Sequence, residues 1–457
     1  MSKIKLNNVD LAWLRMDHAN NPMMITVVLR FNGQIDYDRL IMSLEELVKR
    51  FRRFRQRLVK PRQLFSRPYW EDDLHHQVTD RVETVELPVP ADDGALMALV
   101  SIKMSTPLDF AYPLWQATLV ENYLEGSALI IRIHHCIADG VSLMQILMLL
   151  TQLSPAASEN QIPVQTAAQL AKAAARRSRD TLFGNHPFTE TITAFARIFF
   201  RRPDPSTILK GPLGPVKKAV WSEPLDLSEV KKIAHLKQAT PNDVLMAVVS
   251  GATRRYMDLN GQKRKRNIRA FTMVNLRRRL LNEELGNKFG MVFLTLPLDR
   301  EQPLESLEHV KQGMDNLKNS AESATTYRIL NLLGMLPGWV EHLATMFLDT
   351  KGTVVATNIA GPHRQLYLAG APIQSIITWV PQSGRIGVGW SFVTYNNQVQ
   401  VAVNTDARLI PDTEKFLQLF TEEYRSFQAV LSTDIPEKVT PKEELQQKLP
   451  GSSLDFL

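Results

Sequence analysis

The sequence predicts an α/β protein of two lobes, each a mixed sheet flanked by helices, joined by a long crossover. Strand and helix patterns alternate in the first third of the chain and resume in its second half. A stretch of different composition separates these parts, and 457 residues is long for one domain. We therefore expect a first lobe at 1–153, a crossover at 154–215 and a second lobe at 216–457.

The first lobe shows clear strand and helix signals. β-Branched and large apolar residues predict a strand at 25–31, and apolar residues at helical spacing predict helices at 37–51 and 95–104. Two further strands, 116–122 and 128–134, are separated by a short turn. Because so short a connection joins antiparallel neighbours, the sheet is expected to be mixed.

The predicted crossover begins with small and polar residues and continues with two helical segments. Residues 167–179 are rich in alanine and arginine, and residues 181–202 carry aromatic side chains among polar and basic ones. The second segment has two interpretations. One is an amphipathic helix packed on the body of the protein. The other is an interfacial helix on a lipid surface, with Arg197, Arg201 and Arg202 meeting headgroups.

The second lobe repeats the alternation and closes with an amphipathic helix. Its predicted strands cover 218–222, 267–274, 291–298, 353–358, 373–380, 387–395 and 398–405. Its predicted helices cover 227–236, 242–257, 304–319, 325–345 and 413–431. No repeat of fixed period is visible, so the two lobes are similar only in broad content.

The most informative stretch is the end of the strand at 128–134. It runs into His134 and His135, and the pair Asp139-Gly140 follows before another apolar run. Histidine exchanges a proton near neutral pH, because its unperturbed pKa is about 6.5. Adjacent residues on a strand point to opposite faces, so only one of the two imidazoles is expected to serve a given pocket. Asp139 supplies a fixed carboxylate, and Gly140 permits positive φ.

Residues 134–140 read HHxxxDG, and other motifs accompany them. These are Asn21-Pro22-Met23-Met24, Phe54-Arg55-Gln56-Arg57-Leu58, Pro107-Leu108-Asp109, Pro113-Leu114-Trp115, Ala239-Thr240-Pro241-Asn242-Asp243, Val274-Asn275-Leu276-Arg277-Arg278, Asn358-Ile359-Ala360-Gly361-Pro362 and Leu368-Ala369-Gly370-Ala371-Pro372. From about residue 6 to residue 430, the series resembles the bacterial wax ester synthase/diacylglycerol acyltransferase family. That family lies within the HHxxxDG CoA-dependent acyltransferases, which have a chloramphenicol acetyltransferase-like fold. The DFGWG motif of some wider relatives is absent, since residues 387–391 read GVGWS.

The resemblance implies that His135 is the general base and that His134 supports it. The base would remove a proton from an alcohol, which attacks the thioester of an acyl-CoA directly. Asp139 would be a structural carboxylate that pairs with an arginine, although orientation of His135 as in a catalytic triad is the alternative. Gly140 would close the turn without a Cβ.

Two further stretches have both structural and functional interpretations. Thr240-Pro241-Asn242-Asp243 is a good helix start, with Thr240 at the N-cap. This accounts for Asp243 as a structural residue but not for Asn242, which the resemblance places near the reacting carbonyl as an oxyanion or positioning donor. Trp115 is expected to be a buried anchor after a turn, or a wall of a lipid channel.

Other chemistries are disfavoured. A Cys136 acyl-enzyme is unfavourable because strand geometry points the thiol away from His135. A metal site made of His134, His135 and Asp139 is unfavourable because consecutive histidines on a strand rarely converge on one ion. No glycine-rich phosphate loop is present, so residues that bind a cofactor are not identified. We expect acyl-CoA as co-substrate and no separate cofactor.

Charge and composition limit the partners and the cellular location that we expect. The net charge of +7 comes with clusters of basic residues, which form solvated faces or attract anionic lipid or CoA phosphates. No nucleic-acid motif accompanies them. A single cysteine excludes an intrachain disulfide, and neither a signal peptide nor a membrane-spanning run is visible. We expect a cytoplasmic protein, peripheral to the inner membrane or lipid inclusions.

The combined prediction is an O-acyltransferase that moves a fatty acyl group from acyl-CoA to a long-chain alcohol or to diacylglycerol. One alternative is an acyltransferase of the same fold with another hydroxyl acceptor, such as a polyketide or glycolipid. Another is a non-catalytic lipid-binding protein. Acceptor preference, chain length, CoA contacts and oligomeric state are not encoded in any visible motif.

Overall fold

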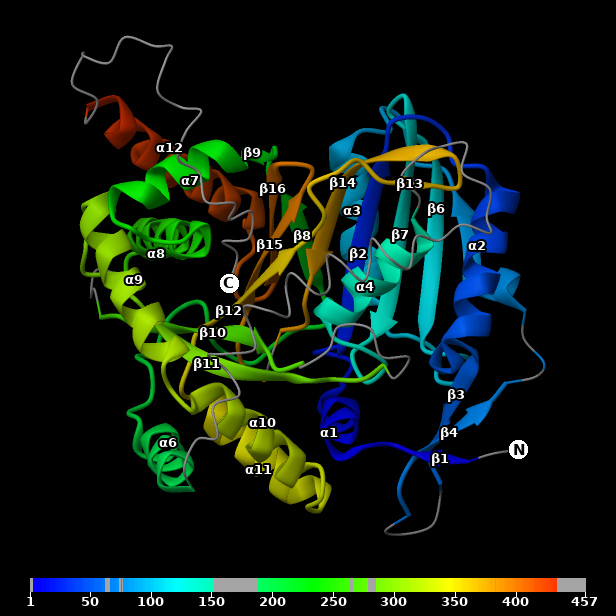
Figure 1. Ribbon diagram of the computed structural model, residues 1–457, viewed down its shortest axis with the longest axis horizontal. Helices are drawn as coiled ribbons and strands as arrows, with labels where there is room; N and C mark the ends of the chain where they lie inside the picture. Colours follow the sequence, from blue (N-terminus) through cyan, green and yellow to red (C-terminus); the bar gives the residue numbers. More distant parts are fainter. Residues whose placement is uncertain are drawn as a thin grey trace, which may run out of the picture.

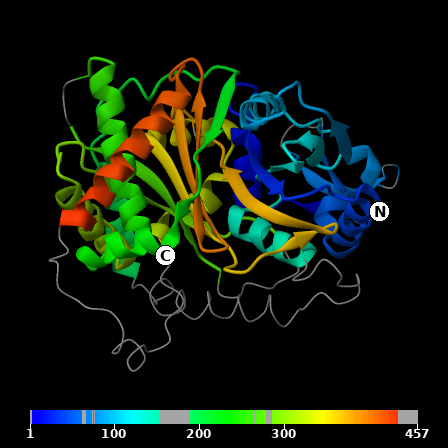
Figure 2. The ribbon, with the colours of Figure 1, turned by 90° about the horizontal axis from the view of Figure 1, so that it is seen from above.

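A computed structural model describes residues 3–61, 66–73, 75, 77–151, 188–262, 266–277, 285–382 and 384–433. Two large mixed sheets lie side by side, and helices cover their outer faces (Figures 1 and 2). A small third sheet of β1 (Ile4–Lys5), β4 (Tyr69–Asp72) and β3 (Gln56–Val59) lies beside the first. The predicted mixed α/β fold is confirmed.

The first sheet has the order β13-β14-β2-β7-β6-β5. These strands are β13 (Tyr367–Leu368), β14 (Ala371–Trp379), β2 (Met24–Phe31), β7 (Gly126–His134), β6 (Trp115–Tyr123) and β5 (Val82–Val85). All neighbours pair antiparallel except β5 and β6, which are parallel. The sheet is therefore mixed, as the short turn between β6 and β7 predicts.

Helices cover both faces of this sheet. Leucines of α2 (Tyr37–Arg50) and α4 (Gly140–Leu150) pack with Leu29 and Ile133 on one face. On the other face, α3 (Asp93–Ser105) packs with Val28 and with residues of the second sheet. Neighbouring residues of β2 thus enter different cores, as strand alternation requires.

The second sheet has the order β11-β10-β12-β15-β16-β8, and β9 pairs with β16. Its strands are β8 (Lys217–Trp221), β9 (Leu225–Asp226), β10 (Ile268–Asn275), β11 (Phe289–Leu296), β12 (Val354–Ala360), β15 (Val388–Tyr395) and β16 (Gln398–Asp406). Four helices share one core with it: α7 (Leu227–Leu236), α8 (Pro241–Leu259), α9 (Pro303–Lys318) and α12 (Thr413–Thr433). Strand β10 is parallel to β12, and β12 is parallel to β15.

One strand crosses between the predicted lobes. β14 comes from the second half of the chain, yet it pairs antiparallel with β2 and extends the first sheet. Figure 1 shows it lying between the two sheets, beside β2. The first sheet is therefore completed by residues far outside 1–153. The division at 153 and 216 remains a prediction about domains.

One local prediction differs from the structure, one helix was not predicted, and one expected helix is not tested. The helix expected at 325–345 is two helices, α10 (Glu322–Leu333) and α11 (Gly338–Asp349), because Pro337 caps the second. Helix α1 (Asn8–Met16) was not predicted, since its short apolar face lies among charged and amide side chains. The expected helix at 167–179 lies outside the described residues. Helix α6 (Phe188–Phe200) lies within the segment expected at 181–202.

Candidate active site

The two histidines follow one another at the end of β7 but have different neighbours. The backbone N–H of His135 donates to the carbonyl of Met23 at 2.7 Å, which ties the turn to the residue before β2. His134 is buried, its Nδ1 accepts from the Cys136 N–H at 3.1 Å, and its Nε2 lies 3.6 Å from Asp17 Oδ1. No contact joins the two rings, so His134 is placed to hold the turn.

Two aromatic rings enclose the imidazole of His135. Trp13 of α1 stacks on it with centroids 4.1 Å apart and planes at 9°. Phe289, the first residue of β11, lies 5.7 Å from it. His135 is only 5% exposed. The ring is therefore held between a helix of the first half of the chain and a strand of the second.

Asn287 determines which nitrogen of His135 carries the proton. The Asn287 amide Nδ2 donates to Asp10 Oδ1 at 2.8 Å and to the His135 carbonyl at 2.7 Å. Its Oδ1 therefore points at His135 Nδ1, 2.8 Å away. Because an amide oxygen only accepts, Nδ1 must be the donor. The Nε2 lone pair is left free, and Nε2 has no hydrogen-bond partner among the described residues.

Burial sets the charge state of this group. Desolvation lowers the pKa of His135 to about 4, against the opposing effects of Asp139 and of the Asn287 hydrogen bond. Desolvation also raises the pKa of Asp10 to about 7, although its hydrogen bonds to Asn287 oppose the shift. The imidazole is thus neutral at physiological pH, in the tautomer that exposes a basic nitrogen.

This charge state predicts a particular pH profile. A base works in its neutral form, so activity is present above the pKa of His135 and is lost as pH falls through it. We expect kcat/KM to be nearly constant from about pH 6 to 8 and to fall with an apparent pKa near 4. Initial rates in mixed buffers measure this, with circular dichroism at each pH to separate unfolding. An acid limb centred near 6.5 would contradict the burial of the ring.

Asp139 holds the loop that follows the histidines. Its Oδ1 accepts from the Ser142 N–H at 2.9 Å and so caps α4. Its Oδ2 accepts from the Lys288 N–H at 3.0 Å and pairs with the buried Arg277. The other Arg277 nitrogen donates to the Gly286 carbonyl. The arginine left unidentified by the sequence is therefore Arg277, and the pair joins the His135 loop to the Asn287 loop.

The side chain of Ile359 leaves little room for a Cβ at Gly140. The φ of Gly140 is not in the positive region, so the positive φ that a glycine permits is not used at this turn. A Cβ built on it would lie 3.0 Å from Ile359 Cδ1. Gly140 starts α4 at the point where Ile359 of β12 closes on it. The constraint is close approach of a side chain, not backbone conformation.

Asn242 and Asp243, at the start of α8, have different contacts. Asp243 forms a capping box with Thr240 at the start of α8. Asn242 is buried, and its Oδ1 accepts from Asn358 Nδ2 at 3.0 Å. The Asn242 Nδ2 has no hydrogen-bond partner among the described residues. Asn358 and Ile359 are adjacent on β12, so their side chains point to opposite faces, and no contact joins Asn242 to Gly140 or to His135.

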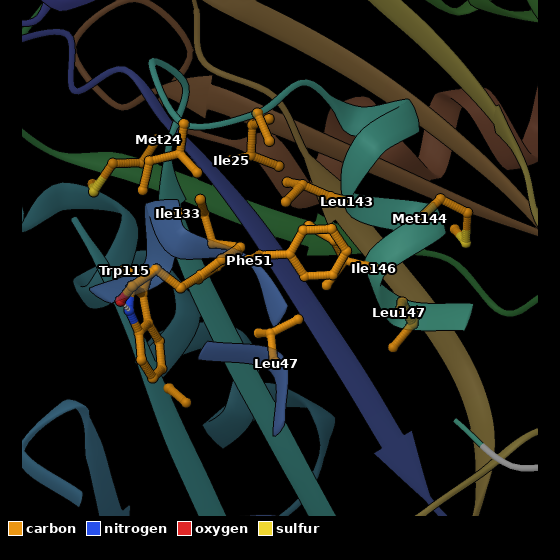
Figure 3. Close-up of a cluster of buried hydrophobic side chains, with 14 of the residues drawn as sticks. Met24, Ile25, Leu47, Phe51, Trp115, Ile133, Leu143, Met144, Ile146 and Leu147 are labelled. Carbon is orange, nitrogen blue, oxygen red and sulfur yellow. Dashed lines mark hydrogen bonds between the residues drawn. The ribbon is translucent and has the colours of Figure 1, made fainter. Parts of the chain in front are cut away.

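Trp115 lines an apolar cavity between α4 and the first sheet. Its indole Nε1 donates to the Phe54 carbonyl at 2.8 Å, which anchors the ring. The cavity is narrow, about 50 Å³, and is lined almost wholly by aliphatic side chains. Figure 3 shows Leu143 and Leu147 of α4 facing this cluster from the side opposite Trp115. Gly140 and Ile359 also line it, so one end lies beside the histidine loop.

The disfavoured chemistries find no geometric support. Cys136 is fully buried, and burial raises the pKa of its thiol, so the thiolate needed for nucleophilic attack is disfavoured. His134, His135 and Asp139 each contact different partners. Their side chains therefore do not converge on a common point.

Sequence reasoning missed four residues that complete the site: Trp13, Asp10, Asn287 and Arg277. The last appeared only within a basic cluster and within a motif. Asn287 lies in Gly286-Asn287-Lys288-Phe289, directly before an apolar strand. Its one signal was a polar residue just before a strand, whereas His135 was identified at the end of a strand and within a motif.

Comparison with known proteins places the chain among acyltransferases. The family "Wax ester synthase/diacylglycerol acyltransferase catalytic domain" matches residues 6–245, and "WS/DGAT C-terminal domain" matches residues 285–428. The O-acyltransferase WSD of Acinetobacter baylyi is 23% identical over 454 residues, covering 93% of this chain and 97% of the relative. A Mycobacterium tuberculosis protein named as a probable diacylglycerol O-acyltransferase is 24% identical over 397 residues, covering 82% of this chain and 85% of the relative.

Two solved structures share the fold. The wax ester synthase/diacylglycerol acyltransferase from Marinobacter aquaeolei VT8 matches with a TM-score of 0.67 at 19% identity, covering 94% of this chain and all of that one. The first condensation domain of the calcium-dependent antibiotic synthetase matches with a TM-score of 0.64 at 15% identity, covering 95% and 97%. At these identities the likeness is one of architecture.

Proposed function

This chain belongs to the wax ester synthase/diacylglycerol acyltransferase family, and on that premise we propose that it transfers a fatty acyl group from acyl-CoA to a hydroxyl acceptor. The acceptor is a long-chain alcohol, giving a wax ester, or diacylglycerol, giving triacylglycerol. One observation carries the proposal. Asn287 fixes His135 in one tautomer, and the His135 Nε2 has no partner among the described residues.

The proposed reaction needs one proton carrier. His135 Nε2 takes the hydroxyl proton as the acceptor oxygen attacks the thioester carbonyl. The tetrahedral intermediate then breaks its C–S bond, and the CoA thiolate recovers the proton from the imidazolium. Burial disfavours the charged ring, which favours this return of the proton. His135 is restored, and no acyl-enzyme forms.

Asn242 is proposed to stabilise the oxyanion. Its Oδ1 is occupied by Asn358, which leaves the Nδ2 hydrogens to donate. One such donor contributes about 2.7–4 kcal/mol to the transition state. Asp139 acts by holding the loop, and Asp243 by capping α8.

The acyl chain is proposed to extend along the cavity between α4 and the first sheet. Its lining is apolar and begins beside Gly140. Because the space is narrow, side chains of α4 must move apart to admit a chain. Met144 is a flexible residue in that wall.

The setting completes the proposal. The thioester is already an activated acyl group, so acyl-CoA is the co-substrate and no separate cofactor is proposed. We propose a cytoplasmic location, peripheral to the inner membrane or lipid inclusions. The single cysteine suits a reducing compartment. No nucleic-acid partner is proposed.

The test is ester formation by the purified protein. With palmitoyl-CoA we expect one CoA released per ester formed, with hexadecanol, dioleoylglycerol or both as acceptor. Thiol release measured with a chromogenic reagent and chromatography of the lipid products follow both sides of the reaction. Release of CoA with neither product would redirect the proposal to another hydroxyl acceptor. No turnover with any acceptor would favour a lipid-binding role.

A further inference from the structure

Helices α6 and α11 leave an unusual number of large apolar side chains uncovered. Of the sixteen exposed large apolar residues among the described residues, nine lie on α6, at the end of α10, on the turn that follows α10 or on α11. They are Ile192, Phe195, Phe199, Phe200, Leu332, Met335, Trp339, Leu343 and Met346. We call this set the apolar surface. Single exposed apolar residues are ordinary, but a clustered set marks an interaction site.

Each helix presents these residues on one face. On α11, Trp339, Leu343 and Met346 follow helical spacing, and Trp339 is 69% exposed. On α6, Ile192, Phe195 and Phe199 do the same, while Ala194 and Ile198 are buried. The helices therefore pack on the protein with one side and leave an apolar side outward.

The two faces are continuous and held in place. The Phe199 ring lies 5.2 Å from the Phe347 ring of α11. Arg201, directly after α6, pairs with the buried Glu322 of α10 at 2.7 Å. Figure 1 shows α6, α10 and α11 grouped on one side of the second sheet. The apolar surface is thus formed before any partner binds.

Charge is arranged around the apolar surface. The carboxylates of α11, Glu341 and Asp349, are buried, and Glu341 pairs with Arg15 at 2.9 Å. The exposed cations nearby are Arg197, Arg202 and Arg328. Glu190 at the other end of α6 is an exposed carboxylate. An aromatic and aliphatic face bordered by arginines is complementary to an anionic lipid surface.

We propose that the apolar surface docks the protein on an anionic lipid surface. No helix of the described residues is long and apolar enough to cross a membrane, so contact through this face would be peripheral. A role of this docking in supplying the acceptor substrate rests on the proposed function. Both proposed acceptors are lipids that reside in such a surface.

Helix α11 also borders a pocket beside the end of α1. This pocket, of about 540 Å³, is lined by His342 and Met346 of α11 and by Arg15 and Met16 of α1. The next residue, Asp17, lies 3.6 Å from His134.

The test compares binding of the full chain to vesicles by flotation. The parent should float with vesicles of phosphatidylglycerol and phosphatidylcholine. The double variant Trp339→Ser/Leu343→Ser should bind at least about tenfold more weakly, since two exposed apolar contacts are lost. The matched control Ile102→Ser/Leu259→Ser removes equally exposed side chains from other helices, and its binding should stay within about twofold.

A charge variant distinguishes binding to anionic lipid from adsorption through apolar contacts alone. Arg197→Gln/Arg202→Gln should lower binding to vesicles that contain phosphatidylglycerol about tenfold or more. Binding to pure phosphatidylcholine should not change. Equal flotation of parent and Trp339→Ser/Leu343→Ser, or equal loss in the control, would overturn the proposal. So would a parent that does not float but forms a dimer dissociated by the same variant.

Rates of ester formation distinguish failure of this inference from failure of the proposed function. With acceptor in detergent micelles, Trp339→Ser/Leu343→Ser should form ester at the parent rate within about twofold. With acceptor in vesicles its rate should fall with its binding. If the parent forms no ester in either presentation, the proposed function fails while the flotation result stands. If the variant loses both rates equally, the docking role fails.

Discussion

Replacing His135 with glutamine is expected to lower kcat by about 10²–10⁴-fold, the usual contribution of a general base. The glutamine side chain keeps polar groups within the space between Trp13 and Phe289 but takes no proton. Substrate binding does not depend on proton transfer, so KM should change much less than kcat. Thiol release under saturating palmitoyl-CoA and acceptor measures both.

Cys136→Ala is the matched control for this substitution. It changes the next residue, which is buried and carries a disfavoured thiolate. Turnover should stay within about threefold of the parent, because only a small buried group is lost. If Cys136→Ala abolished turnover and His135→Gln did not, the thiol would be the catalytic group and direct transfer would be wrong.

Asp139→Ala is expected to destabilise the protein by about 3–5 kcal/mol, because it leaves the guanidinium of Arg277 buried without its partner. It also removes the N-cap of α4, for which about 1 kcal/mol is typical. Arg277→Met should cost less, since Asp139 would keep the Ser142 and Lys288 N–H groups. The midpoints of thermal and urea unfolding measure the order of these losses.

An exposed ion pair provides the control for these variants. Lys49 and Glu46 lie 2.9 Å apart with side chains 66% and 67% exposed. Lys49→Ala should change stability by at most about 0.5 kcal/mol. In a double-mutant cycle, Asp139→Ala and Arg277→Met should be strongly non-additive. Additive losses would mean that the two side chains act independently, and the pair would not be what joins the two loops.

Arg277→Met carries a second expectation that follows from its position. Arg277 joins Asp139 to the Gly286 carbonyl, one residue before Asn287. Loosening that loop weakens control of the His135 tautomer, so kcat should also fall. Stability and catalysis are therefore coupled through one buried arginine.

Many of the strands and helices could be predicted from short stretches of sequence. The strand expected at 128–134 is β7, and the helix expected at 227–236 is α7 with the same bounds. The apolar spacing that marks these elements arises within a few residues, where periods of two and of 3.6 can be distinguished. The single helix expected at 325–345 was wrong because apolar spacing continued past Pro337, which separates two helices.

The sequence alone determined the types and order of most elements and the position of the histidine motif, because these depend on neighbours in the chain. Tertiary structure decided which distant groups surround His135. Its amide partner Asn287 is 152 residues later in the chain, and the carboxylate that orients this amide, Asp10, lies 277 residues before Asn287. Asp139 meets Arg277 across 138 residues, and β14 joins a sheet whose other long strands come from the first half of the chain. Such pairings follow from packing of whole sheets and helices, and no local periodicity specifies them.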